Sequence, residues 1–356
     1  MNKREQPALD LYTSEGWLNI PSLASVQAWC IVVIGKRQVG KTYGTLQYII
    51  QQGTPFVYMR RTDTEFQAIT SDSGLNPFSP FRVGTNHVGI EKEGKISYKI
   101  GETKMDENGV PHVINRLGIG LTLASISRIR GFNGSIFTDV VYDEFIPERI
   151  VVQRKAEGDA LLNAYVTING NRELEGKPPL RLWLLANAFD IGNNVLQELG
   201  IVETVSSMSK KGEEYRLLDT GVLVVMPKSE GISKKRGETA FIRHMSRNKN
   251  SKFYQMAMEN KFSYNNLSQV RAMSLRGMSP EFAVKEKFYC YKYDRLRWYV
   301  CTSPFPTYKT YADNNIGKAQ FFKDYPLFQA AYSLGQVYFS DVSTLLAFQK
   351  FLDIKA

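Results

Sequence analysis

The sequence predicts an α/β fold built around a phosphate-binding loop (P-loop), with a mainly parallel sheet and a small α+β domain at the C-terminal end. An apolar, β-branched stretch at 28–34 runs into the pattern Gly-x-x-x-x-Gly-Lys-Thr at 35–42. A helical pattern and a second apolar strand, 56–59, follow. Strand, Gly-rich turn, helix and strand in succession form a βαβ unit, whose strands are parallel. A third buried strand at 138–142 is followed by two acidic residues, and a P-loop nucleotide site requires carboxylates at such a position.

Length and composition narrow the class of protein. The 356 residues are enough for two domains, and the formal charge of +10 favours a polyanionic partner. The three cysteines and three histidines are scattered, which argues against a disulfide framework, a zinc site and Ser-His chemistry. The N-terminus is polar, and no run of about 18 apolar residues occurs. We therefore expect no export signal and no membrane association.

The remaining elements follow from local pattern. Alternating polar and apolar residues punctuated by turns at 82–123 predict an antiparallel insertion in the parallel domain. Residues 152–172 have helical spacing, and 180–186 form another buried strand. An aromatic hairpin at 287–301 and an amphipathic helix at 342–353 characterise the last part of the chain.

Changes in composition predict three regions. Residues 1–205 form the P-loop domain, 206–266 a basic, partly helical linker, and 267–356 the C-terminal α+β domain. Within the linker, 228–261 contains nine Lys or Arg against three Glu, which gives a net charge of +6.

The P-loop pattern predicts a nucleotide site because both of its flanks agree with it. Glycines allow backbone N–H groups to turn toward phosphates at a helix N-terminus. Lys41 would contact the β- and γ-phosphates, and the Thr42 hydroxyl would complete the shell of a Mg²⁺ ion. The alternative is a tight turn without a ligand. The predicted nucleotide-binding residues are Gly35, Lys36, Arg37, Gln38, Val39, Gly40, Lys41, Thr42 and Tyr43.

Two later strand ends complete the predicted site. Asp143 would hold Mg²⁺ through water, and Glu144 would polarise the attacking water, which favours hydrolysis and an ATPase of the catalytic-glutamate (ASCE) type. Asn187, which emerges from the strand at 180–186, would sense the γ-phosphate or this water. The alternatives are a strand capped by solvated acids and an ordinary loop asparagine. ATP and Mg²⁺ are the expected ligands.

The same motifs resemble a known family. IGKRQVGKT, FVYMRR (56–61), VVYDEF (140–145), INGNRE (168–173) and LLANA (184–188) occur in the order found in viral DNA-packaging ATPases, and are most similar to those of the Phi-29-like short-tailed phages. The resemblance is good from about residue 28 to 205 and weak beyond. It implies a homo-oligomeric, pentameric ring at the portal of a procapsid in the host cytoplasm. This ring would move double-stranded DNA at the expense of ATP, and a structural RNA is a further partner in that branch.

The resemblance also suggests roles for four arginines. Arg37 would add a phosphate contact, and Arg130, with Arg128 nearby, matches a basic DNA-channel loop. Such a loop would bind backbone phosphates without reading bases; the alternative is a solvated charged loop. Arg172 is the candidate arginine finger toward a neighbour's γ-phosphate, which in related mechanisms is worth about a thousandfold or more in rate.

The match departs from the family at two positions. Gly170 stands where relatives carry an arginine, and Asp63 stands where a lysine is expected. A trans-acting role for the second of these loops would therefore fall on Arg60 and Arg61.

For the C-terminal domain we expect a scaffold that resembles a vestigial RNase H-like nuclease and lacks nuclease activity. A two-metal nuclease needs several converging carboxylates. Here the hairpin offers only Asp294, at its turn, and Asp341 and Asp353 come late in the chain. Basic and aromatic residues of this domain would bind DNA, RNA or the portal; equally, the rings could face the core. The basic residues are Lys285, Lys287, Lys292, Arg295 and Arg297.

Two other functions remain open at this level. A hexameric helicase-like or other nucleic-acid-stimulated ATPase would need aromatic stacking residues near the pore loop, where Phe132 is the single ring. A non-motor adaptor would use the P-loop only to stabilise the fold.

Overall fold

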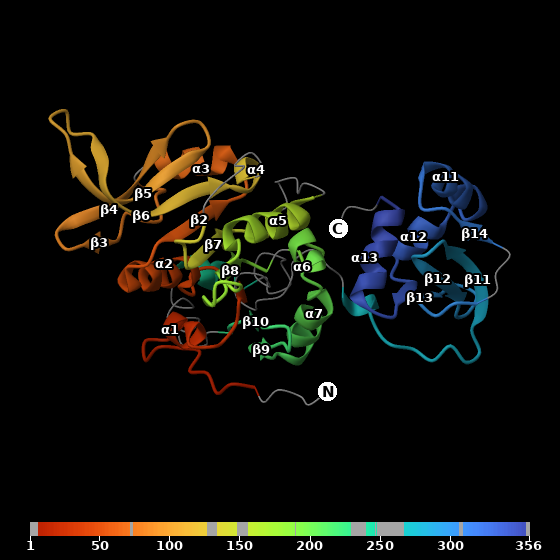
Figure 1. Ribbon diagram of the computed structural model, residues 1–356. Coiled ribbons are helices and arrows are strands. Elements are labelled where there is room, and N and C mark those ends of the chain that lie inside the picture. The colour runs from red at the N-terminus through yellow and green to blue at the C-terminus, as the bar shows by residue number, and fades with distance from the viewer. Residues whose placement is uncertain are drawn as a thin grey trace. The chain divides into compact units, whose positions relative to one another are not determined.

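The computed structural model describes residues 6–71, 74–126, 134–147, 156–188, 190–228, 240–245, 247, 267–305 and 309–353 (Figure 1). The chain divides into two compact units. The first comprises described residues within Met1–Phe189, Asn193–Leu199 and Met208–Ser263. The second comprises those within Asp190–Gly192, Gly200–Ser207 and Tyr264–Ala356. The helix expected near 251–262 lies outside the described residues, and of the basic stretch after Lys228 only 240–245 and 247 are described.

A ten-stranded sheet forms the first unit, in the order β3-β4-β5-β6-β2-β7-β8-β1-β10-β9. The strands are β1 (Cys30–Ile34), β2 (Phe56–Arg60), β3 (Arg82–Val83), β4 (Asn86–Glu93), β5 (Ser97–Met105), β6 (Pro111–Thr122), β7 (Asp139–Asp143), β8 (Arg181–Ala186), β9 (Tyr215–Leu217) and β10 (Val222–Val225). The central six, from β6 to β10, are parallel, and the outer ones are antiparallel. The predicted α/β fold with a mainly parallel sheet is confirmed.

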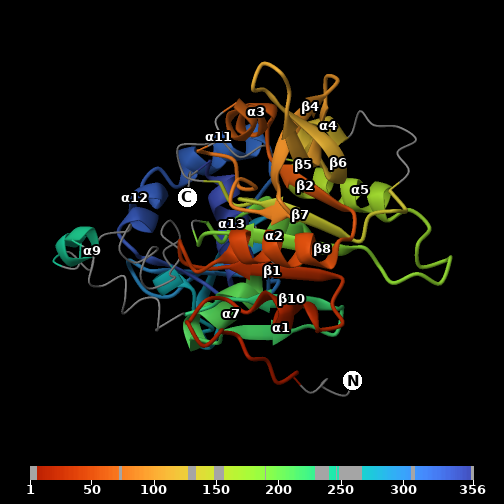
Figure 2. The same ribbon diagram turned by 90° about the vertical axis from the view of Figure 1, so that its left-hand side faces the viewer.

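Helices cover both faces of this sheet. The helices of the described chain before residue 250 are α1 (Ile20–Ala24), α2 (Lys41–Gln52), α3 (Asp63–Ser71), α4 (Leu123–Ile126), α5 (Glu157–Asn169), α6 (Asn194–Glu198), α7 (Val202–Lys211) and α9 (Ala240–Met245). The first residues of α7 belong to the second unit. Alternate residues of β1, Ile31 and Val33, pack with Leu46 of α2 and Leu23 of α1 in one cluster. Figure 1 shows α2 and α5 on opposite faces, and Figure 2 looks onto the face that α2 covers. The apolar runs of the central strands are thus buried on both sides, as parallel strands require.

The antiparallel insertion predicted at 82–123 comprises β3 to β6, and β6 pairs in parallel with β2. The close approach of α3 to this insertion depends on a glycine. A Cβ at Gly120 would lie 2.2 Å from Cζ of Phe66. Phe66 in turn stacks on Tyr98 of β5 with ring centroids 4.2 Å apart. The ring of Phe66 therefore occupies the volume that any side chain at 120 would need.

The predicted linker at 206–266 differs from what the structure shows in its first part. β9 and β10 lie within it and extend the large sheet beyond β1. The four residues of β10 are all buried, because the strand pairs with β1 in the middle of the fold. The many basic residues nearby favoured the prediction of a connecting region. The apolar residues 222–225, however, belong to the core.

The second unit contains a five-stranded sheet in the order β14-β11-β12-β13-β15. Its elements are the 3₁₀ turn η2 (Leu267–Gln269), β11 (Ser279–Val284), β12 (Phe288–Lys292), β13 (Trp298–Cys301), β14 (Thr310–Tyr311), β15 (Val337–Phe339), α11 (Asn315–Asp324), α12 (Phe328–Ser333) and α13 (Val342–Phe351). Ring contacts of Phe282, Phe288 and Phe339 with helical phenylalanines bind the helices to one face. The expected α+β domain, hairpin and last helix are present. Within the described parts of the chain, no helix is long and apolar enough to cross a membrane.

Replacement of Gly120 by alanine should destabilise the first unit. The added methyl group must displace Phe66, and overpacking of this kind costs about 1–3 kcal/mol. We expect a lower midpoint of urea unfolding, followed by circular dichroism. Ile114→Ala is the control, since it changes an exposed side chain on the same strand, β6. Equal midpoints for wild type and Gly120→Ala would contradict the packing described here.

Candidate functional site

The candidate site is a cleft of about 350 Å³ at the edge of the sheet where β1, β7 and β8 end. Parallel pairing brings the carboxyl ends of these strands together, and ligands of open α/β sheets bind outside such ends. The cleft is lined by Arg37, Gln38, Gly40, Lys41, Thr42, Tyr43, Asp143, Glu144, Leu185, Ala186 and Asn187. The three motifs that the sequence singled out are therefore brought together in space.

The P-loop connects β1 to the first turn of α2. Gly40 has a φ of +89°, in the left-handed region that glycine tolerates, and no side chain caps the N-terminus of α2. A helix N-terminus without a side-chain cap offers its backbone N–H groups to an anion. Two of the four non-glycine residues with positive φ in the described chain, Gln38 and Glu144, also line the cleft. Unfavourable backbone conformations of this kind concentrate at functional sites.

Lys41 folds back onto its own loop. Its Nζ donates to the carbonyl oxygens of Gly35 at 3.0 Å and Lys36 at 2.6 Å. It also donates to Oδ1 of Asn187 at 3.0 Å. These acceptors satisfy the buried ammonium group of Lys41. Asn187 follows β8 directly. Because it contacts Lys41, a ligand bound by Lys41 would lie close to the Asn187 amide as well.

Asp143 is held by hydrogen bonds at the end of β7. Oγ1 of Thr42 donates to its Oδ1 at 2.9 Å, and the hydroxyl of Tyr58 donates to its Oδ2 at 3.0 Å. Burial raises the pKa of Tyr58 well above its usual range, and Asp143 adds to that shift. The phenol therefore keeps its proton and remains a donor to the carboxylate. Thr42 and Asp143 form a pair of oxygen groups at the mouth of the P-loop.

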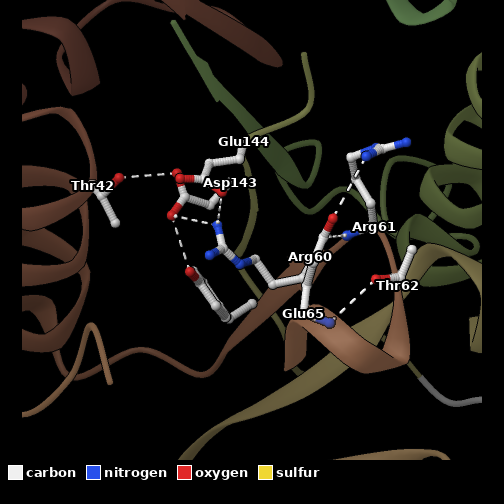
Figure 3. Close-up of polar contacts among 8 residues, drawn as sticks. Thr42, Arg60, Arg61, Thr62, Glu65, Asp143 and Glu144 are labelled. Carbon is white, nitrogen blue, oxygen red and sulfur yellow. Dashed lines mark hydrogen bonds and ion pairs between the residues drawn. The ribbon is translucent and has the colours of Figure 1, made fainter. Parts of the chain in front are cut away.

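Arg60, at the end of β2, is the counter-ion of both acids (Figure 3). Its Nη1 lies 3.4 Å from Oδ2 of Asp143 and 3.0 Å from Oε2 of Glu144. Burial opposes the charge of Arg60, but Tyr58, Asp143 and Glu144 overcome this and raise the pKa of the guanidinium. The Arg60 side chain is 12% exposed, whereas that of Glu144 is 60% exposed. Glu144 is thus the accessible carboxylate of the two and Asp143 the buried one.

Arg61 points away from the cleft and joins three elements. Its Nη2 lies 2.7 Å from Oε1 of Glu157 at the start of α5, and its Nη1 lies 3.5 Å from Oε1 of Glu65 on α3. The backbone N–H of Arg61 donates to Glu65 as well (Figure 3). Arg61 and Glu157 are both buried. Loss of one partner of a buried ion pair costs about 3–5 kcal/mol, so this pair locks the end of β2 in place.

Arg172 does not reach the cleft of its own chain. It lies in the turn after α5 and is 5% exposed. Its Nη1 donates to the carbonyl oxygens of Ser135 and Phe137 at 2.8 and 2.7 Å, and its Nε to that of Pro178 at 3.1 Å. These bonds hold the chain that enters β7 against the chain that enters β8. Arg128 and Arg130 lie outside the described residues.

Sequence reasoning did not predict the two side chains that hold Asp143 from behind: it gave Tyr58 no role and considered Arg60 only for a trans-acting one. Tyr58 and Arg60 act on the acids from a strand 83 to 85 residues earlier in the chain. Tyr58 reads as one more apolar member of a buried strand, and Arg60 as the polar end of it. The available signal was an arginine that ends an otherwise fully buried strand. A second buried strand ends at Asp143, and Glu144 follows it.

No protein-family model and no curated protein sequence matches this chain. Among solved structures, the bacteriophage Phi-29 viral genome packaging motor assembly superposes with a TM-score of 0.61 at 19% identity, over 95% of this chain and 99% of that chain. The Phi-28 gp11 DNA packaging motor superposes with a TM-score of 0.58 at 17% identity, over 96% of this chain and 100% of that chain. Sequence identities this low establish a shared fold. The chain has the fold of the Phi-29-like DNA packaging motor proteins, which confirms at the level of fold the resemblance found in its motifs.

Proposed function

We propose that this protein hydrolyses ATP and uses the energy to move double-stranded DNA into a viral procapsid. The observation that carries the proposal is the meeting of Lys41, Thr42, Asp143 and Asn187 in one cleft. The fold shared with two packaging motors supports it. Measurement of ATP turnover against protein concentration, with and without duplex DNA, tests it.

The cleft accommodates the chemistry of phosphoryl transfer to water. Backbone N–H groups of the P-loop would hold the phosphates, and Lys41 would exchange its carbonyl acceptors for β- and γ-phosphate oxygens. Glu144, exposed and next to Asp143, would orient the attacking water and accept its proton. Asn187, which contacts Lys41, would contact the γ-phosphate or the same water.

The residues present fit a Mg²⁺ ion. Magnesium takes few protein ligands, all oxygens, and completes its shell with water and substrate phosphates. Thr42 and Asp143 present hydroxyl and carboxylate oxygens 2.9 Å apart at the phosphate end of the cleft. The ion would neutralise charge on the phosphates, while Tyr58 and Arg60 orient the carboxylate from behind.

The active assembly would be a homo-oligomeric ring, pentameric by analogy, on the portal in the host cytoplasm. Arg37 would add a phosphate contact, and Arg128 and Arg130 would bind the DNA backbone. A structural RNA is a further candidate partner. Sequence-independent contacts with phosphates are sensitive to salt, as an indiscriminate DNA pump requires.

The contacts of Arg172 bear on its proposed role as a trans-acting finger. Its guanidinium would have to leave three carbonyl oxygens to reach a neighbour. Its contacts favour a structural role, and Arg60 and Arg61 are engaged by acids of their own chain.

The second unit would bind nucleic acid or the portal without nuclease activity. Asp294 accepts hydrogen bonds from Leu296 N and Arg297 N within its own turn. Asp341 caps α13 through Thr344 N, and Asp353 pairs with Lys318 at 2.8 Å. Among the described residues, no group of three or more His, Cys, Asp or Glu side chains is placed to hold a metal ion. These acids serve the local fold, which favours a scaffold resembling a nuclease that has lost its cluster.

Lys41→Ala and Glu144→Gln should separate binding from chemistry. The alanine variant loses the phosphate contact, so we expect weaker MgATP binding and no turnover. The glutamine variant keeps the shape of the side chain but cannot accept a proton, so it should bind MgATP and turn it over at least about 100-fold more slowly. Calorimetry and phosphate release measure the two effects. Full turnover in Glu144→Gln would rule out the assigned base.

Tyr58→Phe should weaken Mg²⁺-dependent nucleotide binding. Loss of a hydrogen bond that orients a metal ligand typically costs about 10–100-fold in affinity. Titration of nucleotide binding with Mg²⁺ measures it. Tyr165→Phe is the matched control, because the partly buried hydroxyl of Tyr165 donates to the carbonyl of Leu180 and not to Asp143. An unchanged Mg²⁺ dependence in Tyr58→Phe would argue against Asp143 as a ligand.

Arg172→Ala should lower stability more than it lowers catalysis. Three carbonyl oxygens would lose a charged donor, at a cost of about 2–4 kcal/mol in the free energy of unfolding. A finger acting in trans would instead leave the unfolding midpoint unchanged and reduce turnover by about a thousandfold or more. Urea unfolding and ATPase activity on the same preparations decide between them, and Arg181→Ala on the same unit is the control.

A further inference from the structure

A second cavity adjoins the phosphate cleft. It has a volume of about 850 Å³, within the range of about 300–1,000 Å³ typical of small-molecule sites. The two cavities share Gln38, Gly40 and Tyr43. Trp17, Asn19, Gln47, Tyr48 and Gln51 also line the larger one. None of the motifs that define the phosphate site explains it.

The direction of a bound nucleotide points into this cavity. Asp143, Glu144 and Asn187 mark the γ-phosphate end of the cleft. The chain of phosphates would then run past the first turn of α2, and its other end would leave the cleft at Gly40 and Tyr43. The larger cavity begins at those two residues. A group attached to the α-phosphate would therefore lie at the opening of the larger cavity.

Part of the N-terminal segment forms one wall of the cavity. This segment contacts the P-loop directly. Leu18 N donates to the carbonyl of Val39 at 3.1 Å, and a Cβ at Gly40 would lie 3.4 Å from Cε3 of Trp17. Gly44 lets α1 approach α2, since a Cβ there would lie 2.9 Å from Cγ1 of Ile20. The segment is thus held in place beside the loop.

Two aromatic rings stand exposed at this wall. Trp17 is 44% and Tyr43 51% exposed. Tyr43 is supported from behind by Phe81, with ring centroids 5.0 Å apart. Indole and phenol rings offer faces on which any nucleobase stacks, and such stacking contributes strongly to affinity.

Amide side chains supply polar groups on the helical side. Gln47 and Gln51 follow Tyr43 at intervals of four along α2, so the three share one face of the helix. Within the described part of the chain, the amides of Gln47 and Gln51 make no hydrogen bond. A glutamine amide pairs in bidentate fashion with the donor and acceptor edge of adenine.

We propose that this cavity is the nucleobase subsite, in which Trp17 and Tyr43 stack on the base and the Gln47 amide reads adenine. The proposal rests on the proposed ATPase function. It assigns to residues 17–19, outside every motif of the phosphate site, a part in nucleotide selection.

Calorimetry with MgATP, MgGTP and magnesium tripolyphosphate tests the subsite on the full chain. Trp17→Ala should weaken MgATP binding by about 10-fold or more and leave tripolyphosphate binding unchanged, because only the base is lost. Trp17→Phe should retain most of the affinity. Gln47→Leu should reduce the preference for MgATP over MgGTP. Leu174→Ala, an exposed apolar residue of the same unit outside the cavity, is the control.

Fluorescence gives an independent readout. MgATP should change the emission of Trp17 in the wild type, tripolyphosphate should not, and the change should be absent in Trp17→Phe. If MgATP and tripolyphosphate bind the wild type and Trp17→Ala equally well, the subsite is refuted while the phosphate site stands. If neither ligand binds the wild type, the ATPase function itself is refuted.

Discussion

Parallel pairing of β2, β7, β8 and β1 is the constraint on which the rest of the structure depends. In such a set, every strand delivers the residues that follow it to the same edge of the sheet. The P-loop, the two acids, Asn187 and Arg60 arrive there from four separate stretches of chain. The register is maintained by fully buried strands whose apolar side chains fill both faces, so the geometry of the cleft derives from the hydrophobic core.

Within the cleft, each buried charge already has partners before a nucleotide enters. Carbonyl oxygens surround the ammonium of Lys41, and Thr42, Tyr58 and Arg60 surround the carboxylate of Asp143. Burial of an unpartnered charge would be costly, so these contacts allow the site to exist in the free protein. Phosphate and magnesium would replace some of these partners and keep others. Glu144, which is largely exposed, is the group least confined by this network.

The comparison with packaging motors illustrates how little of a sequence a fold requires. Identity is below one residue in five, yet superposition extends over nearly the whole of both chains. Proteins with the same fold must share the pattern of buried positions and the order of strands. Many combinations of apolar residues can fill those buried positions. In this chain Tyr58 and Arg60 contact the acids, and the Arg61–Glu157 pair holds the end of β2 in place.

The sequence by itself determined the elements that depend on neighbours in the chain. The P-loop between a buried strand and a helix, the acids at the end of 138–142, the antiparallel insertion and the aromatic hairpin are all local patterns. Only the tertiary structure decided which elements lie side by side. It brought Tyr58 and Arg60 to Asp143, and it buried the Arg172 side chain against the carbonyls of Ser135 and Phe137. It also added β9 and β10 to the sheet and set Trp17 against Gly40. Periodicity specifies which face of an element is buried, whereas strand order arises from the packing of the whole core, which no short window of sequence contains.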